Sequence, residues 1–173
     1  MTVAIAAIVL IFGGTYLSKE RYLAVVHRQA DEVLQTNNNL VDEISRLLAS
    51  GKPEDFKRII EIRNYLQSQR SGLPSLTIIY SGRFADKLAL YRVGDYVSET
   101  KETGITYSPS YYTCTQNVDC DYLSRFFASG QAQILQKYTM RDDQFYIYIP
   151  YTGKERKFVM LFERRNQYGK LGS

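Results

Sequence analysis

The chain has 173 residues, of which 45% are hydrophobic, and its formal net charge at pH 7 is +4. Lys and Arg are scattered among Asp and Glu, and the densest basic cluster, Lys154-Glu155-Arg156-Lys157, lies beside a predicted hairpin turn. A nucleic-acid-binding protein collects its basic residues on one face or in one run, so nucleic acid is not expected as a partner. About 150 residues follow the N-terminal apolar segment, which is enough for one domain with one core.

The N-terminal segment carries no charge from Val3 to Leu17. Its length lies near the lower limit of about 17 to 25 residues for a membrane-spanning helix. It has neither the preceding Lys or Arg nor the closing Ala-x-Ala site of a cleavable signal peptide. We therefore expect residues 1–18 to form a transmembrane anchor, which is short enough to have been truncated. By charge alone, Lys19 and Arg21 would place the rest of the chain in the cytoplasm.

A helical hydrophobic pattern follows, with steps that alternate between three and four residues. It consists of Leu23, Val26, Ala30, Val33, Asn37, Leu40, Ile44 and Leu47. One polar residue at a core position, here Asn37, is typical of a parallel coiled-coil dimer. Further apolar residues widen the stripe and favour packing of the helix on its own domain: Leu34, Val41 and Leu48. Both interpretations stand, on different faces of one helix that ends at about Ala49, and a homodimer is expected.

Ser50-Gly51-Lys52 ends this helix, because Gly after the last periodic residue is the usual C-terminal signal. A second predicted helix begins at Pro53 and ends before Ser71-Gly72-Leu73-Pro74. Its apolar stripe consists of Phe56, Ile59, Ile60 and Leu66.

The hydrophobic period then changes to two. β-branched residues predict a buried strand from Leu76 to Tyr80. Leu88 to Arg92 and Tyr96 to Thr100 flank Val93-Gly94-Asp95, and they form either a tight hairpin or one long bulged strand. The segment from Lys101 to Asp119 is irregular, and loops of this length are usually functional or internally stapled.

A short helix and an antiparallel meander complete the chain. The helix is capped by Asp119 or Asp121, runs through Phe127 and ends at Ser129-Gly130. Three strands follow, separated by turn compositions: Ala132 to Met140, Gln144 to Tyr151 and Arg156 to Arg164. Bulky residues occupy both faces of the last two strands, which indicates a sheet covered on both sides.

These elements predict an α+β fold in which the long N-terminal helix packs on one face of an antiparallel sheet of about five strands. The irregular segment and the short helix are expected to cover the other face. Residues 19–70 then hold the two helices, residues 71–165 form the sheet with its connections, and residues 166–173 are a C-terminal linker.

The two cysteines, Cys114 and Cys120, admit three interpretations. A zinc site needs two further soft ligands, and the sole histidine, His27, lies far away in the first predicted helix. A redox-active pair is more often Cys-x-x-Cys beside a helix start. A small structural disulfide fits best and implies an oxidising compartment. We therefore expect no metal and no cofactor. Against the charge rule, we expect an inner (plasma) membrane protein with its domain in the periplasm or extracellular space.

The stretch Phe126-Phe127-Ala128-Ser129-Gly130 leads through Gln133-Ile134-Leu135 to Tyr146-Ile147-Tyr148-Ile149-Pro150. In this stretch, and in the order of elements over nearly the whole chain, the sequence resembles the Cache family of extracytoplasmic PAS-like sensor domains. The resemblance implies the ligand-sensing domain of a transmembrane receptor of histidine kinase, cyclase or chemoreceptor type. Its N-terminal helix would pass a ligand-induced change to the membrane, and an output module would lie outside this chain. The family's amino-acid-binding motif is not recognisable, so no ligand residues are carried over.

The chain contains 15 tyrosines and no tryptophan. Tyrosine suits pockets for polar small molecules, although exposed sheet faces also collect it. Arginine pairs a ligand carboxylate through two parallel hydrogen bonds. We expect a small-molecule ligand, such as an amino acid or organic acid, to be bound by Tyr91, Arg92, Tyr111, Tyr112, Arg125, Tyr138, Tyr146 and Tyr148.

No catalytic residues are predicted, because the sequence contains no nucleophile elbow, phosphate-binding glycine loop or metal-spaced cluster. The alternative function is a single-pass membrane-anchored assembly protein. Its exported domain would bind another protein through the tyrosine-rich sheet, since tyrosine is enriched in such contacts.

Overall fold

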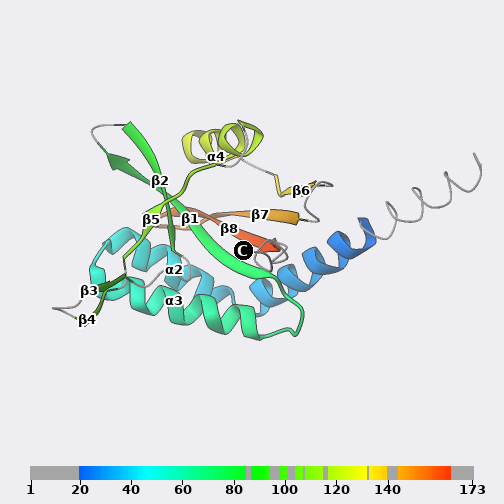
Figure 1. The fold of residues 1–173 in the computed structure, drawn as a ribbon, viewed down its shortest axis with the longest axis horizontal. Coiled ribbons are helices and arrows are strands. Elements are labelled where there is room, and N and C mark those ends of the chain that lie inside the picture. The colour runs from blue at the N-terminus through cyan, green and yellow to red at the C-terminus, as the bar shows by residue number, and fades with distance from the viewer. Residues whose placement is uncertain are drawn as a thin grey trace, which may run out of the picture.

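The computed structural model has an α+β fold, with one antiparallel sheet between helices on both of its faces (Figure 1). The predicted fold class is therefore confirmed. The structure describes residues 20–84, 87–93, 98–100, 104–106, 108–114, 117–131, 133–139 and 144–164. The anchor predicted for residues 1–18 and the linker predicted for residues 166–173 lie outside these ranges. Within them, no helix has the length and apolar composition that crossing a membrane requires.

The main sheet has six strands, each antiparallel to its neighbours, in the order β5-β2-β1-β8-β7-β6. The strands are β1 (Ser75–Phe84), β2 (Lys87–Val93), β5 (Ser110–Tyr111), β6 (Leu135–Thr139), β7 (Gln144–Thr152) and β8 (Lys157–Arg164). The predicted meander is confirmed as β6, β7 and β8, although β6 begins three residues later than expected. The long strands β1 and β8 pair with each other at the centre of the sheet.

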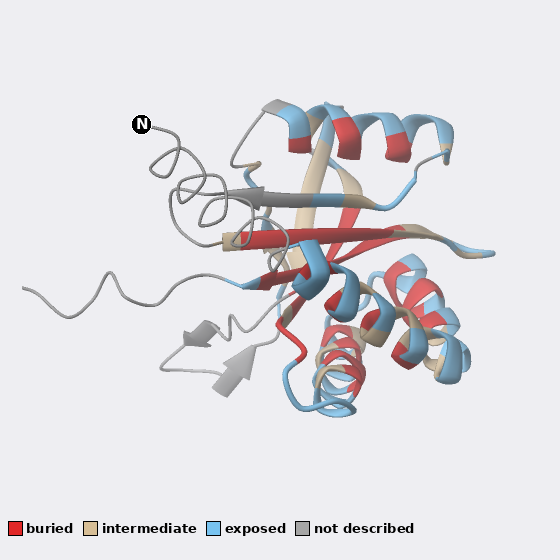
Figure 2. Cartoon of the chain, turned by 90° about the vertical axis from the view of Figure 1, so that its right-hand side faces the viewer, coloured by how far each residue is buried: buried red, intermediate tan, exposed pale blue. Residues whose placement is uncertain are grey.

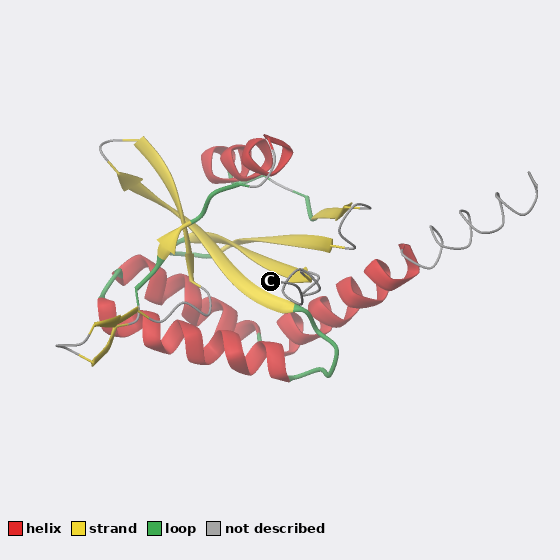
Figure 3. Ribbon diagram, viewed as in Figure 1, coloured by secondary structure: helices red, strands yellow, loops and turns green. Residues whose placement is uncertain are grey.

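The two strand segments predicted around Val93-Gly94-Asp95 do not pair with each other. β2 pairs with β1, whereas β3 (Ser98–Thr100) pairs with β4 (Gly104–Thr106) in a separate two-stranded sheet (Figure 3). The predicted tight hairpin is therefore wrong, whereas the alternative bulged strand would run through residues 94–97, which lie outside the described residues. The reason is that β1 continues past Tyr80 to Phe84, so it offers β2 an antiparallel register from Ile78 onward.

Three helices cover one face of the sheet: residues 20–36, α2 (Asn38–Ser50) and α3 (Pro53–Ser68). As predicted, α3 has Pro53 in its first turn, and Gly51 ends α2 with a left-handed φ of 65°. These helices pack on alternate residues of β7 and β8, namely Phe145, Ile147, Ile149, Phe158, Met160 and Phe162. Figure 2 shows the buried residues concentrated on the sheet and on the helix surfaces that face it.

The predicted continuous first helix is interrupted at Asn37, which has φ −115° and ψ 34°. The Asn37 side-chain amide donates to the carbonyl of Val33 at 2.8 Å. Asparagine competes with helix bonding in this way, so a local hydrogen bond explains this polar residue. The stripe residues Leu23, Val26, Ala30 and Val33 belong to the same buried core as the sheet. Packing of the helix on its own domain is therefore confirmed, and the dimer seam stays a prediction.

The segment between β7 and β8 is fixed to α2. The Ser45 hydroxyl donates to the carbonyl of Arg156 at 2.9 Å and accepts from the Arg156 amide at 3.0 Å. The Arg156 guanidinium donates to the carbonyls of Leu48 and Ser81 at 2.7 and 2.5 Å. It also lies 5.2 Å from the centre of the Tyr80 ring. Hydrogen bonds as well as apolar packing therefore join the helices to the sheet here.

The helix α4 (Asn117–Ser129) covers the opposite face of the sheet (Figure 1). It begins two residues before the predicted Asp119 and ends, as predicted, at Ser129-Gly130. The core on this side consists of Ile79, Tyr122, Leu123, Phe126, Phe127, Tyr146, Tyr148, Val159 and Leu161. Residues of β7 and β8 thus alternate between two cores, which confirms that both faces of the sheet are covered.

Candidate functional site

The structure divides the eight predicted ligand-binding residues among different surfaces. The α4 side of the sheet carries Arg92, Tyr112, Tyr146 and Tyr148, and the helix side carries Tyr91 and Tyr111. Arg125 is exposed on α4. Tyr138, on β6, pairs with Phe145 of β7, and the side chain of Tyr138 lies outside the described residues. The eight residues therefore do not form one site.

Tyr91 and Tyr111 belong to an aromatic stack on the helix side. The ring centres of Tyr91 and Tyr111 are 5.1 Å apart, those of Tyr80 and Tyr91 are 5.5 Å apart, and Phe56 on α3 follows at 6.4 Å from Tyr80. Gly82 allows the close approach of Tyr91, because a Cβ there would lie 2.6 Å from the ring atom Cε2. The stack joins α3 to the outermost strand β5, so these two tyrosines are explained by packing.

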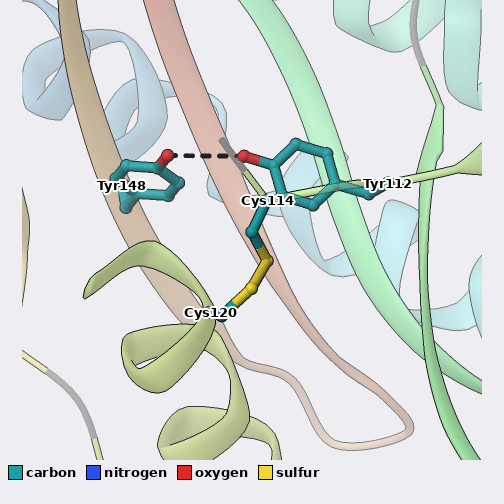
Figure 4. The surroundings of a disulfide bond; sticks show 4 residues. All are labelled: Tyr112, Cys114, Cys120 and Tyr148. Carbon is teal, nitrogen blue, oxygen red and sulfur yellow. Dashed lines mark hydrogen bonds between the residues drawn. A yellow bond between two sulfur atoms is a disulfide. The ribbon is translucent and has the colours of Figure 1, made fainter. Parts of the chain in front are cut away.

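On the α4 side, Tyr112 and Tyr148 meet through their hydroxyl groups, whose oxygens are 3.3 Å apart (Figure 4). Tyr148, on β7, is 0% exposed. Tyr112 follows β5, and its amide donates to the carbonyl of Leu90 at 2.9 Å. Two residues further on, Cys114 is joined to Cys120 of α4 by a disulfide. The predicted disulfide is thus present, and it ties the segment that carries Tyr112 to α4.

Two carboxyl groups are buried in the same layer. Asp119, in the first turn of α4, is 0% exposed, and Glu163, on β8, is 8% exposed. Burial raises the pKa of both the Tyr112 and the Tyr148 hydroxyls, and the nearby carboxylate of Asp119 adds to this rise. Both hydroxyls therefore stay protonated and act as hydrogen-bonding groups. Glu163 was not among the predicted site residues, although its place two residues after the inward-facing Leu161 was a signal for it.

The C-terminal end of α4 is fixed by capping interactions. Gly130 has a left-handed φ of 75°, and its amide donates to the carbonyl of Phe126 at 2.7 Å. From β8, the ammonium group of Lys157 donates to the carbonyl of Phe127 at 2.8 Å. The chain between α4 and β6, of which residues 131, 133 and 134 are described, is called the linker below. Because Gly130 reverses the chain, this linker returns towards Tyr122 in the middle of α4.

A cavity of about 340 Å³ lies between α4 and this linker, which is within the usual size range of small-molecule sites. Its lining residues are Tyr122, Arg125, Gln131, Gln133, Ile134 and Leu135. The Tyr122 hydroxyl donates to the carbonyl of Gln133 at 2.8 Å and so ties the linker to α4. Arg125 is the only charged residue among these six, and its Nε donates to the carbonyl of Asp121 at 3.2 Å. Arg125 thus lines this cavity and does not belong to the tyrosine layer, which consists of Tyr112, Tyr146 and Tyr148.

Strand β6 joins this cavity to the opposite face of the sheet. Leu135 lines the cavity and packs against the core on the α4 side. The next residue, Gln136, points to the helix side, because neighbouring strand residues alternate between faces. Its Nε2 lies 2.7 Å from Nδ1 of His27 in the N-terminal helix, and Nε2 of His27 lies 3.2 Å from Oδ2 of Asp31. His27 therefore connects the N-terminal helix to the edge strand β6.

A second cavity, of about 360 Å³, lies beside α2. It is lined by Asn39, Asp42, Glu43, Ser45, Arg46, Lys154 and Glu155. Its lining mixes three carboxylates with two cations, so negative and positive charges lie side by side. The carboxylate of Glu43 also pairs with Nε of Arg58 at 3.0 Å. This cavity offers a ligand no single dominant charge.

Among the described residues, no three or more His, Cys, Asp and Glu side chains are grouped so that they could hold a metal ion. No protein-family model, no curated protein and no solved structure matches the chain. The geometry of the chain itself is therefore the basis for a functional proposal.

Proposed function

We propose that this chain is the extracytoplasmic ligand-sensing domain of a transmembrane signalling receptor, of the Cache-like kind that its sequence resembles. A small molecule binds on the α4 side of the sheet, and the N-terminal helix passes the resulting change to the membrane. The segment of residues 1–18 anchors the domain in the inner (plasma) membrane, and the domain works as a homodimer outside the cytoplasm.

The observation that carries the proposal is the position of β6 between the cavity and the N-terminal helix. Leu135 lines the cavity, and the adjacent Gln136 contacts His27. A ligand that draws β6 towards α4 changes the position of Gln136 relative to His27. Such a ligand shifts the domain only as far as its affinities for the two arrangements differ, and couplings of about 1 to 3 kcal/mol are typical.

Two further features support transmission through the N-terminal helix. Residues 20–36 are helical, and in the sequence they follow the segment predicted to be the anchor. Its stripe residues, from Leu23 to Val33, are buried in the core that includes Ile147 of β7. A movement of the meander is therefore passed to the helix through packed side chains.

A thermal screen tests the proposal. The whole 173-residue chain is held in a non-ionic detergent, and its thermal midpoint is measured with amino acids, organic acids, amines and purines. A ligand at a hundredfold excess over Kd stabilises by about 2.7 kcal/mol, which raises the midpoint by several degrees. A dose-dependent rise with one class supports sensing, whereas no rise with any class contradicts it.

A second candidate function is the binding of another protein. It is favoured by Leu88 and Tyr111, which lie on the two strands at one edge of the sheet and are each 56% exposed. This function predicts a partner whose binding is lost in the variant Leu88→Ser/Tyr111→Ser and unchanged in Arg125→Gln.

A further inference from the structure

We infer that the cavity beside α4 binds a small monocarboxylate with a short apolar chain, and that Arg125 is the charge partner of its carboxylate. This inference rests on the proposed sensing function, because it names the ligand class and the place where the ligand binds.

The charge of the cavity selects an anion. Among the described residues that line it, Arg125 is a cation and none is a carboxylate. The Nε of Arg125 donates to the carbonyl of Asp121 one turn earlier in α4, and this bond holds the guanidinium beside the helix. A guanidinium binds a carboxylate through two parallel hydrogen bonds.

The rest of the lining suits the other parts of such a molecule. The amides of Gln131 and Gln133 are hydrogen-bonding groups close to the arginine, and Ile134, Leu135 and the Tyr122 ring provide apolar surface. Ile134 is 38% exposed, so its side chain leaves apolar surface open to a ligand. A carboxylate at one end of a short hydrocarbon chain matches both kinds of surface.

The alternative places are unsuitable for a carboxylate. The tyrosine layer contains the buried acids Asp119 and Glu163, which repel a second anion. The cavity beside α2 contains Asp42, Glu43 and Glu155, which already balance its cations. The cavity of Arg125 is the one of these three places in which the positive charge is not matched by a lining carboxylate.

One wall of the cavity is fixed before the ligand arrives. The disulfide of Cys120 secures the first half of α4, and the bond from Lys157 to the carbonyl of Phe127 secures its C-terminal end. The linker is tied to α4 through Tyr122 and Gln133. A ligand between Arg125 and the linker adds a second tie, and little ordering of α4 is needed when it binds.

Isothermal titration calorimetry on the whole chain tests the inference, with butyrate as the probe. Butyramide, butylamine and inorganic phosphate are the comparison compounds, since they remove the charge, reverse it or change the shape of the anion. We expect Arg125→Gln to weaken butyrate binding by about tenfold to a hundredfold. Arg46→Gln is the matched control, because it makes the same change on a helix residue of the other cavity. It should leave butyrate binding unchanged.

The outcomes separate the inference from the proposed function. Undiminished butyrate binding in Arg125→Gln, equal losses in both variants, or phosphate bound as tightly as butyrate would overturn the inference. If amines or purines bind and carboxylates do not, the inference about a monocarboxylate is overturned, whereas the proposed sensing function stands. If no compound of any class binds, both fail. Arg125 is exposed, so an unchanged thermal midpoint of Arg125→Gln without ligand shows that a lost signal is not lost folding.

Discussion

The two faces of the sheet share their strands but differ in chemistry. On the helix side, three helices pack on a mainly phenylalanine and aliphatic core, beside which Tyr80, Tyr91 and Tyr111 form a stack. On the α4 side, tyrosine hydroxyls, two buried carboxyl groups and a disulfide lie under one helix of 13 residues. Segments with fewer apolar contacts open at lower free energy. The comparison teaches that the helix side supplies stability, whereas the α4 side is the place where a ligand can change the structure.

Removal of a large core side chain should separate the two faces most clearly. Phe158→Ala on the helix side should lower the free energy of unfolding by about 3 to 5 kcal/mol, because Phe158 is fully buried among elements that cannot close the space. Phe127→Ala on α4 should cost less than Phe158→Ala, about 3 kcal/mol, since a single helix can move into the space. Denaturant unfolding of both variants measures the difference. Equal losses would contradict the division of roles.

Alkaline pH should weaken both faces through buried tyrosines. Burial raises the pKa of Tyr80, on the helix side, to about 12, although the Arg156 cation opposes this, and burial raises the pKa of Tyr122 on α4 to about 12. The unfolded chain releases these protons near pH 10, so stability is complete below that pH and is lost as the pH rises towards 12. Each tyrosine contributes about 1.4 kcal/mol per pH unit in this window.

Denaturant midpoints at pH 9 and pH 11 measure this loss. Tyr80→Phe and Tyr122→Phe should each make the decline with pH shallower than in the wild type. A decline that is identical in all three proteins would show that these hydroxyls do not titrate as their burial requires.

The disulfide should act locally, on the α4 side. Cys114 and Cys120 are only six residues apart, so the loop they close is short. The chain-entropy relation then gives a loss of about 2 kcal/mol for Cys114→Ser/Cys120→Ser. Hydrogen exchange should accelerate in residues 110–114 and in the first turn of α4, while α2 and α3 stay protected. Faster exchange in α2 and α3 would show that the two faces are not separate.

The smallest effect should come from the hydroxyl pair. Tyr148→Phe removes one partner of the contact with Tyr112 and should cost about 0.5 to 1.5 kcal/mol. In a double-mutant cycle, Tyr112→Phe should cost less when Tyr148 is already phenylalanine. Fully additive losses would mean that the two hydroxyls do not interact.

Much of the fold could be predicted because the alternation in β7 and β8 is strong. The assignment of Phe145 and Tyr146 to opposite faces follows from the period of two, and both are where the pattern put them. The break at Asn37 was not predictable from the stripe, since the residues on both sides of it keep their spacing. It coincides with a local hydrogen bond from the Asn37 side chain to the carbonyl of Val33, which also accepts the Asn37 backbone amide.

The candidate site was predicted less well, and part of the reason is visible in the sequence. Tyr91 and Arg92 are neighbours in one strand, as Tyr111 and Tyr112 are neighbours along the chain, so neither pair could share a face. The cavity itself could not be predicted. It depends on the reversal at Gly130 and on the hydrogen bond from Tyr122 to the carbonyl of Gln133, a contact that the hydrophobic period does not indicate.

The contact between His27 and Gln136 allows the most direct test of transmission from the cavity to the N-terminal helix. The chain has one histidine, so its imidazole gives a single set of NMR signals in the untagged protein. We expect butyrate to shift these signals in the wild type, with the same Kd as in calorimetry, and not to shift them in Arg125→Gln. Saturating butyrate binding with unchanged His27 signals would contradict the proposed route through β6.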